Sequence, residues 1–175
     1  MLSILIPTFN YNVAPLVSEL YNQCMRIENL EFEIHVNDDA SKQTFENDLI
    51  ENLKHCYFHK QKSNQGLSAS RNYLITKANH QWCLFLDDDV WPTSDNFILN
   101  YIEKIKQENQ ICVIFGGLEY TKEIPKTNEL LRWLYGNKHE ALSFKLRIQN
   151  KPKHFLSSNL LANKSVNVSL PNSLS

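Results

Sequence analysis

The sequence predicts an α/β protein with a mostly parallel central sheet and helices on both of its faces. Short apolar runs rich in β-branched residues alternate with segments in which apolar residues recur every three or four positions. Strands that alternate with single helices form right-handed βαβ units, and these units place helices on both faces of the sheet. A chain of 175 residues without a repeat or an obvious linker suits one domain with a real core.

Five strands are expected, and each is a short apolar run bounded by polar residues. They comprise residues 2–7, 32–36, 56–59, 82–86 and 112–116. A later segment, residues 153–165, is expected to begin as a strand and to end as a helix. We expect His59 and His154, which fall within these segments, to be strand residues without a catalytic role.

Helices are expected between the strands. The spacing of Val13, Val17, Leu20 and Cys24 predicts the first helix. A second is predicted over residues 43–54, with an inward face of Phe45, Leu49, Ile50 and Leu53. Further helices are predicted over residues 67–78, from Pro92 or Ser94 to Ile105, and over residues 127–136, where Leu130, Leu131 and Leu134 lie near one side.

Composition and charge argue against several classes of protein. The net charge is -1 and no basic run occurs, so composition gives no reason to expect a nucleic acid or an anionic membrane as partner. No apolar stretch approaches the ~20 residues that span a bilayer, and the N-terminus lacks the features of a signal peptide. The four cysteines are widely spaced, which favours reduced, buried side chains in a cytosolic protein over a zinc site.

The most informative motif is LFLDDDV, residues 84–90, in which three carboxylates follow a predicted buried strand. Like charges this close raise one another's pKa, and a divalent cation that neutralises them would explain the arrangement. Mg2+ and Mn2+ prefer such oxygen ligands, and they keep positions open for phosphate oxygens when one or two carboxylates hold them. Asp38 and Asp39 should lie at the same edge, because such sheets bind ligands at the carboxyl ends of their strands. A solvated acidic turn is the simpler alternative.

Five segments, in order, resemble motifs of the family 2 glycosyltransferases, which have the GT-A fold. SILIPTFN resembles the opening strand and first nucleotide loop, and VNDDAS resembles the V-D-D-x-S motif. NQGLSASRN resembles N-x-G-x-x-x-A-R-N, LFLDDDV the D-x-D segment, and FLSSNLLANKS the later F-x-S-x-N segment. Each motif alone is weak, but the ordered set, from about Leu2 to Ser165, is strong.

The resemblance implies a binding role for each residue that matches a motif. The residues expected at a nucleotide-sugar donor are Pro7, Thr8, Asn10, Asp38, Asp39, Gly66, Arg71, Asp87 and Asp88. The residues expected to hold Mn2+ or Mg2+ are Asp89 and Asp87, and those expected on the acceptor side are Asn159 and Trp133.

Within this set, the resemblance implies specific chemistry. Asp39, with Asp38 beside it, would accept a hydrogen bond from a uracil imide and so select a UDP-linked donor. Gly66 would let the backbone approach the nucleotide, and Arg71 would add a fixed positive charge. Asp89 would hold the metal on the diphosphate, where the metal stabilises the leaving UDP.

The resemblance also implies how the chain is divided and where it acts. One GT-A domain would contain a nucleotide-binding part, residues 1–116, and an incomplete acceptor-side part, residues 117–175. The expected reaction is inverting transfer to a hydroxyl of a growing polysaccharide or a lipid-linked glycan. We expect a cytoplasmic enzyme that associates peripherally with the inner face of the membrane.

The sequence departs from the family pattern at the general base. An inverting enzyme needs a base for the acceptor hydroxyl, and the family uses an acidic residue, commonly in an E-D motif. No such pair follows Asn159, and the last acidic side chain is Glu140. We therefore assign no catalytic base, and expect a shortened chain that binds nucleotide and metal but transfers sugar poorly or not at all.

Other interpretations remain open from the sequence. They include a nucleotide-sugar-binding remnant without activity, a phosphatase of the haloacid dehalogenase type, and a receiver-like acidic pocket. At single residues, Arg71 could be a surface arginine, Asp38 and Asp39 could cap a helix, and Asn159 could be a turn residue. Trp91 and Trp133 are more typical of core or rim aromatics than of sugar-stacking platforms.

Overall fold

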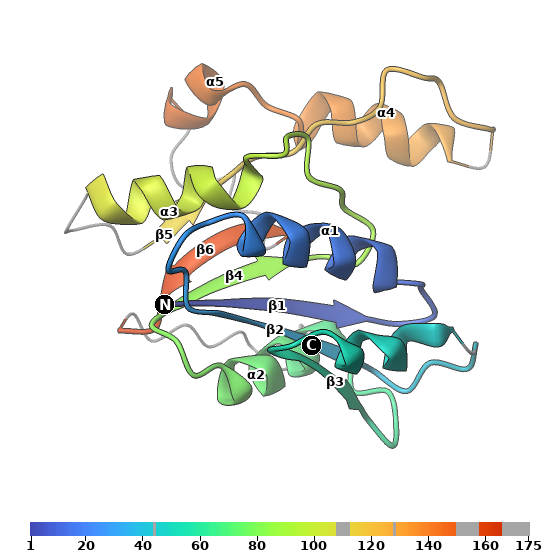
Figure 1. The fold of residues 1–175 in the computed structure, drawn as a ribbon. Helices are drawn as coiled ribbons and strands as arrows, with labels where there is room; N and C mark the ends of the chain where they lie inside the picture. The colour runs from blue at the N-terminus through green and yellow to red at the C-terminus, as the bar shows by residue number, and fades with distance from the viewer. Residues whose placement is uncertain (44, 108–112, 128, 150–157, 166–175) are drawn as a thin grey trace.

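The computed structural model describes residues 1–175 except 44, 108–112, 128, 150–157 and 166–175. It confirms the α/β class: a mostly parallel six-stranded sheet lies between helices in the described part of the chain (Figure 1). The strands are β1 (Leu2–Thr8), β2 (Phe32–Asp38), β3 (Cys56–Lys60), β4 (Trp82–Leu86), β5 (Val113–Phe115) and β6 (Asn159–Asn163). The helices are α1 (Ala14–Met25), η1 (Glu46–Asn52), α2 (Leu67–Lys77), α3 (Phe97–Gln107), α4 (Leu130–His139) and α5 (Phe144–Gln149).

The strand order, β3-β2-β1-β4-β6-β5, brings the polar loops to one edge. The first four strands are parallel, and Thr8 pairs with Asp38 at the carboxyl ends of β1 and β2. β6 runs antiparallel to β4, so its first residue, Asn159, pairs with Leu86, the last residue of β4. The loops after β1, β2 and β4 and the start of β6 therefore meet at a single edge of the sheet.

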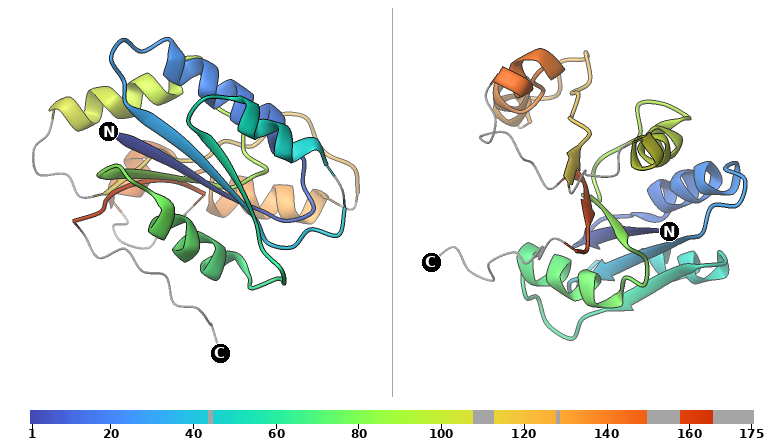
Figure 2. Two further views of the ribbon diagram at one scale, coloured as in Figure 1. Left: turned by 60° about the horizontal axis from the view of Figure 1, so that its bottom comes forward. Right: turned by 90° about the vertical axis from the view of Figure 1, so that its left-hand side faces the viewer.

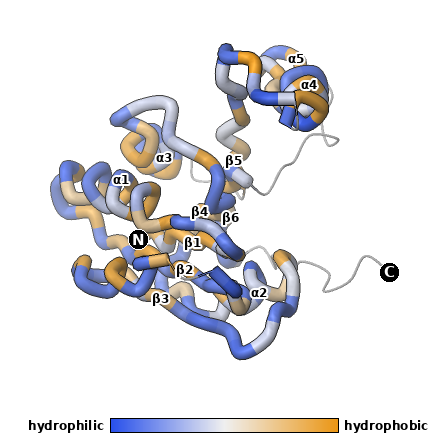
Figure 3. The backbone as a smooth tube through the Cα atoms, turned by 90° about the vertical axis from the view of Figure 1, so that its right-hand side faces the viewer, coloured by the Kyte–Doolittle hydropathy of each residue, from blue (hydrophilic) through white to orange (hydrophobic). Residues whose placement is uncertain are grey.

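The main hydrophobic core lies on the face covered by α1, α3 and η1, and α2 covers the other face (Figure 2). Every residue of β1 and β2 is buried, because helices cover both faces of these central strands. α1 buries Leu16, Val17, Leu20 and Cys24 against the sheet, as its spacing predicts. Apolar residues follow the central strands, and polar residues lie mainly in the loops around them (Figure 3).

The structure corrects the prediction for residues 43–54. This segment forms a 3-10 helix, η1, in place of an α-helix. Asn47 and Ile50 are buried three residues apart, whereas Leu49 is 52% exposed and does not belong to the inward face. Asn47 is fixed by hydrogen bonds: its side chain accepts from the Val13 N–H at 3.0 Å and donates to the Tyr11 carbonyl at 2.9 Å.

The prediction for residues 153–165 was also wrong in part. The helix expected at the end of this segment is not formed: Asn159–Asn163 is strand β6, between β4 and β5. The first residues of the segment, including His154, lie outside the described residues. Cross-strand pairing on both sides of β6 outweighs the local helical preference of Leu160, Leu161 and Ala162. Helix α5 was not predicted.

Three of the four cysteines, Cys24, Cys56 and Cys83, are free and buried, as expected, and Cys112 lies outside the described residues. Burial raises the pKa of the Cys24 and Cys56 thiols to about 12. These side chains therefore act as small hydrophobic groups. Within the described residues, no helix has the length and apolar character needed to cross a membrane.

Candidate functional site

Asp88, the middle residue of the acidic triplet, joins the loop after β4 to the loop after β1. Its carboxylate accepts hydrogen bonds from the Thr8 hydroxyl at 2.7 Å and the Phe9 N–H at 3.3 Å. Burial raises the pKa of Asp88, these hydrogen bonds offset part of that rise, and the charges of Asp89 and Asp87 add to it. Asp88 thus holds two of the predicted donor loops together.

Asp87 pairs with Arg71, which projects from α2 to the same edge. Arg71 is 5% exposed, so its charge is available only to groups at this site. Burial raises the pKa of Asp87, and the guanidinium of Arg71 partly offsets that rise. The pair explains why a buried arginine is tolerated in α2, because the two charges compensate each other.

Asp38 and Asp39 are both buried, and both organise loops. Asp38 accepts hydrogen bonds from the N–H and the hydroxyl of Ser41, the former at 2.9 Å. Asp39 accepts from the backbone N–H groups of Gln65 at 2.8 Å and Gly66 at 2.7 Å. Gly66 has φ of 87°, a conformation that favours glycine, so the turn places its N–H toward the carboxylate.

Asn10 connects the first loop to the loop after β2. Its backbone N–H donates to the Ser41 hydroxyl at 2.7 Å, and its side chain accepts from the N–H groups of Lys42 at 2.8 Å and Gln43 at 3.2 Å. Asn10 has φ of 54°, which Asn tolerates better than most residues. The predicted loops therefore form one hydrogen-bonded rim.

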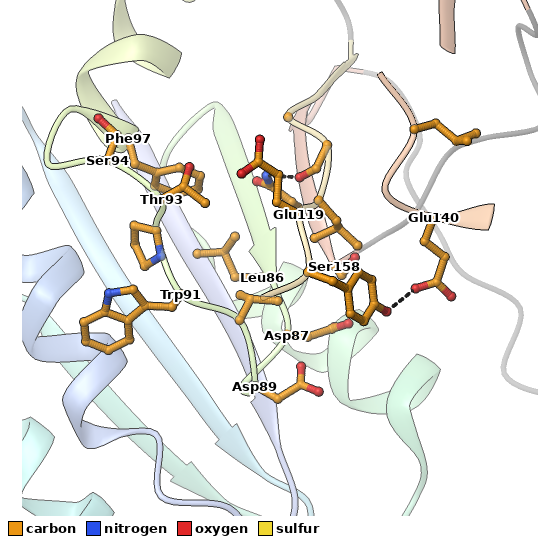
Figure 4. A pocket seen from close by; sticks show the side chains of 18 of the residues that line it. Leu86, Asp87, Asp89, Trp91, Thr93, Ser94, Phe97, Glu119, Glu140 and Ser158 are labelled. Carbon is orange, nitrogen blue, oxygen red and sulfur yellow. Dashed lines mark hydrogen bonds between the residues drawn. The ribbon is translucent and has the colours of Figure 1, made fainter. Parts of the chain in front are cut away.

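A cavity of about 1140 Å3 opens beside this rim, between the sheet edge and the α4–α5 segment. Asp87 and Asp89 line it on one side, and Trp91, Glu119 and Glu140 line it elsewhere (Figure 4). Asp89 is exposed within it. A cavity of this size is sufficient for a bound small molecule.

A second polar cluster of the cavity wall is built around Glu140, and it lies near enough to the triplet for the charge of Asp89 to act on Tyr120 and Arg132. Its carboxylate accepts from the Tyr120 hydroxyl at 2.6 Å and from Arg132 at 2.9 Å (Figure 4). Burial opposes the charge of Glu140, but these two partners outweigh it and lower its pKa. Burial and the hydrogen bond to Glu140 raise the pKa of Tyr120 to about 12. No sequence motif marks this cluster; its only signal in the sequence is that Glu140 is the last acidic side chain.

Asn159 lies at the floor of the cavity, at the start of β6. Its side chain accepts from the Tyr101 hydroxyl at 2.7 Å and donates to the Gly117 carbonyl at 2.9 Å. Gly116 permits this packing, because a Cβ there would collide with Tyr101 and Asn159. Asn159 is thus a structured residue of the cavity wall, not a simple turn residue.

The structure divides the predicted site residues into two groups. Four of them line the cavity: Arg71, Asp87, Asp89 and Asn159. The rest of the predicted donor residues lie in the adjoining rim or strand ends: Pro7, Thr8, Asn10, Asp38, Asp39, Gly66 and Asp88. Trp133 is not among the lining residues; its indole N–H donates to the Thr121 carbonyl at 2.8 Å. Trp91, which is 59% exposed, lines the cavity in its place.

The residues present fit a divalent metal held jointly with a ligand. Asp87 and Asp89 line the same cavity, and Asp89 is the more exposed of the two. Among the described residues, no group of three or more His, Cys, Asp or Glu is arranged to hold a metal. Mg2+ and Mn2+ commonly bind one or two carboxylates and complete their coordination with phosphate oxygens and water, so two carboxylates suffice.

The fold of the described residues is the GT-A fold. The family described as Glycosyl transferase family 2 matches residues 3–168, and the chain belongs to this family. This membership decides against the phosphatase and receiver interpretations. No curated protein sequence matches the chain.

Solved structures show the same fold at low sequence identity. S. aureus TarS 1-349 has a TM-score of 0.63 and 18% identity, over 99% of this chain and 51% of TarS 1-349. The mannosyltransferase PcManGT from Pyrobaculum calidifontis, with GDP-Man and Mn2+, has a TM-score of 0.60 and 14% identity, over 98% and 47%. Glucosyl-3-phosphoglycerate synthase from Mycobacterium tuberculosis, with UDP, has a TM-score of 0.58 and 12% identity, over 94% and 57%. The chain thus spans about half the length of the first of these proteins.

Proposed function

We propose that this chain binds a nucleotide-diphosphate sugar, UDP-linked, and transfers the sugar with inversion to an acceptor hydroxyl. The observation that carries the proposal is the cavity wall of Arg71, Asp87 and Asp89 in a member of family 2. Two related structures support a nucleotide-sugar donor: TarS 1-349 contains UDP-GlcNAc, and PcManGT contains GDP-Man. Because these two donors differ in base, the preference for uracil rests on Asp38 and Asp39.

The carboxylate of Asp39 is held in a geometry that suits recognition of a base. Each oxygen of Asp39 already accepts one backbone N–H, and a carboxylate oxygen has a second lone pair for an imide N–H. The backbone hydrogen bonds would hold this carboxylate still, which favours discrimination between bases. Pro7, Thr8 and Asn10 would frame the base and ribose from the neighbouring loop.

For the metal, we propose Mn2+ or Mg2+ held by Asp89 and Asp87 together with the diphosphate. The presence of Mn2+ beside GDP-Man in PcManGT supports this choice. When bound, the ion would stabilise the negative charge that develops on the leaving nucleotide. Arg71 would keep Asp87 ionised at this buried position and would add positive charge beside the diphosphate.

No general base is assigned by the described residues. Glu119 and Glu140 are the carboxylates outside the triplet that line the cavity among the described residues. Glu140 is a poor proton acceptor, since Tyr120 and Arg132 occupy its oxygens and its pKa is lowered. Because Glu140 is already hydrogen-bonded, we keep a second candidate function: a nucleotide-sugar-binding protein that transfers sugar weakly.

For the acceptor, we propose a growing polysaccharide or a lipid-linked glycan, handled in the cytoplasm at the inner face of the membrane. Residues 1–116 would bind the nucleotide, and residues 117–175 would contribute to the acceptor side, where Asn159 lines the cavity and Trp133 does not. The arrangement of the elements supports this division. The loops after β1, β2 and β4 form the rim, whereas residues of α4 and α5 form another part of the cavity wall.

Calorimetric titration tests the donor half directly. UDP, GDP, dTDP and ADP are titrated into the full chain with and without Mn2+. We expect UDP to bind most tightly, and we expect Asp89→Ala to abolish the contribution of Mn2+, because it removes the exposed carboxylate of the acidic triplet.

Asp95→Ala is the matched control, since Asp95 is an exposed carboxylate of the same β4–α3 connection. It should bind UDP like the wild type. The absence of nucleotide binding in the wild type would overturn the proposed function. An equal loss of UDP affinity in Asp89→Ala and Asp95→Ala would indicate a general effect on the loop and would contradict a specific role of Asp89. Transfer or hydrolysis of a UDP-sugar by the wild type would then separate an enzyme from a binding protein.

A further inference from the structure

Helix α4 turns an apolar stripe away from the rest of the molecule. Leu131, Leu134 and Tyr135 are 81%, 49% and 57% exposed, and helical spacing puts them on one face with Lys138. The opposite face carries the contacts: Gly136 packs on Tyr120. An amphipathic helix normally buries its apolar stripe, so this orientation calls for a partner.

Helix α5 and the segment before α4 extend the same surface. Leu146 and Ile124 are also exposed, at 46% and 73%, whereas the exposed Phe144 lines the cavity. α4 and α5 lie together at one end of the molecule (Figures 1 and 3). We call this surface the outer face, and its apolar residues are Ile124, Leu131, Leu134, Tyr135 and Leu146.

Positive charge is concentrated in the same part of the chain. Residues 121–149, which include α4 and α5, contain six Lys and Arg against three Asp and Glu, whereas residues 1–120 contain nine against sixteen. The net charge of -1 conceals this division, which is why whole-chain composition gave no reason to expect an anionic membrane. Among the residues of this part, Lys122, Lys126, Lys138 and Lys145 are exposed.

We infer that the outer face docks onto the surface of an anionic lipid bilayer. Exposed apolar side chains flanked by lysines are the combination that binds such a surface, by insertion at the headgroup boundary and by attraction to acidic lipids. A second copy of the chain fits less well, because a symmetric interface would place this basic surface against itself. The inference deepens the membrane association proposed above, and it does not depend on the donor chemistry.

Docking in this way has a consequence for the active site. Residues 1–120, the acidic part that contains the triplet, would face away from the negatively charged bilayer. The basic α4–α5 segment would lie between these residues and the bilayer. The cavity is lined by residues of that same segment, including Arg132, Glu140 and Arg147. A lipid-linked acceptor would therefore reach the cavity from the membrane side.

Vesicle cosedimentation tests the inference on the full chain. The probes are vesicles of phosphatidylcholine alone and of phosphatidylcholine mixed with phosphatidylserine. We expect binding to the mixed vesicles that weakens as salt is raised. The double variant Lys138→Glu and Lys145→Glu should lower that affinity by about tenfold or more, and Leu131→Ser with Leu134→Ser by about tenfold.

Each variant has a matched control outside the outer face. Lys54→Glu with Lys106→Glu makes the same change in net charge, and Leu49→Ser removes a similarly exposed leucine. The controls should bind like the wild type. UDP binding measured on every variant separates this test from the proposed function. No binding to mixed vesicles, equal losses in the controls, or a change of the leucine variant from dimer to monomer would overturn the inference.

Discussion

At the scale of single residues, the carboxylates of the rim hold loops as much as they present charge. Asp39 joins the loop after β2 to the turn before α2 through two backbone N–H groups. Asp88 joins the loop after β4 to the loop after β1. Hydrogen bonds to ionised groups are about twice as strong as neutral ones, so these side chains fix the shape of the site before any ligand arrives.

We therefore predict that Asp39→Ala destabilises the fold as well as weakening nucleotide binding. The change leaves two N–H groups without their acceptor, and we expect a loss of roughly 3 kcal/mol in the free energy of unfolding. Urea denaturation measures it. Asp48→Ala, at an exposed aspartate of η1, should change stability little. Similar values for the two variants would show that Asp39 does not organise the turn.

A buried polar cluster beneath α2 is the second feature at this scale. His35 lies 3.0 Å from His59 between Nδ1 and Nε2, and 3.2 Å from the carboxylate of Glu33. Burial lowers the pKa of His59 to about 4, with help from His35 and Lys77, so the ring is neutral in the folded protein. Burial opposes the charge of Glu33, but hydrogen bonds from Ser3 and Asn79 hold its pKa at about 2.

The histidines predict a loss of stability in mild acid. The unfolded chain takes up a proton on His59 near its ordinary pKa, whereas the folded chain does so only near 4, so stability falls as pH falls through this window. After allowing for partial exposure, we expect a loss of roughly 1 kcal/mol between about pH 7 and pH 5. The lowered pKa of Glu33 affects stability at lower pH. Its contribution to the free energy of unfolding is complete above a pH of 4.5 and is lost as pH falls toward 2.

Urea midpoints measured across this pH range check the assignment. His59→Gln should flatten the slope, and His139→Gln, at an exposed histidine, should leave it unchanged. An unaltered slope in His59→Gln would rule out this histidine as its cause.

At the scale of elements, α2 and α4 both depart from the usual rule that a helix packs through an apolar stripe. α2 has no clear stripe, and it packs on a mixed sheet face: Ser70 contacts Asn37 at 2.9 Å, whereas Leu74 joins a buried apolar cluster with Leu5 and Phe85. α4 has a stripe but turns it outward. In neither helix does the sequence pattern alone decide which side faces the molecule.

The orientation of α4 depends on Gly136, where a Cβ would collide with the ring of Tyr120. Alanine favours helix formation, so in an isolated helix Gly136→Ala would be stabilising by about 1 kcal/mol. In this protein we predict the opposite sign, a loss of roughly 1–3 kcal/mol, because the helix must move away from Tyr120. Chemical denaturation measures the change.

Asn137→Ala provides the comparison, since Asn137 is exposed on the next position of the same helix. It should be neutral or slightly stabilising. If Gly136→Ala also stabilised the protein, the contact between α4 and Tyr120 would not exist in solution.

At the scale of the whole molecule, buried contacts are unevenly distributed. β1 and β2 are buried throughout, and β4 is buried from Trp82 to Leu86. α4, in contrast, buries a single residue, Gly136. The α4–α5 end should therefore open without unfolding the sheet, which is compatible with the proposed docking of this segment on a membrane.

Native-state hydrogen exchange should show this difference. We predict the greatest protection in β1, β2 and β4 and much faster exchange in α4 and α5, because few buried contacts hold these helices. Equal protection across the two regions would mean that the α4–α5 end is as firmly packed as the sheet. Addition of anionic vesicles should slow exchange in α4 and α5 selectively.

The sequence by itself determined the α/β class, the first four strands and the loops that carry the acidic residues. These features are local or follow from the order of elements: apolar periodicity marks strands and helices, and parallel strands bring their carboxyl ends to one edge. For this reason Asp38, Asp39 and the triplet could be assigned to one site before their contacts were known.

Only the tertiary structure decided what lies around that edge. Asn159–Asn163 became a strand because β4 and β5 pair with it on both sides, and Glu140 entered the cavity because Tyr120 and Arg132 hold it there. The outward orientation of the apolar stripe of α4 could not be predicted from the sequence either. A helical pattern shows that a helix has two faces, but it does not show which face contacts the rest of the protein. Such outcomes depend on contacts between residues far apart in the chain, and the local pattern does not encode them.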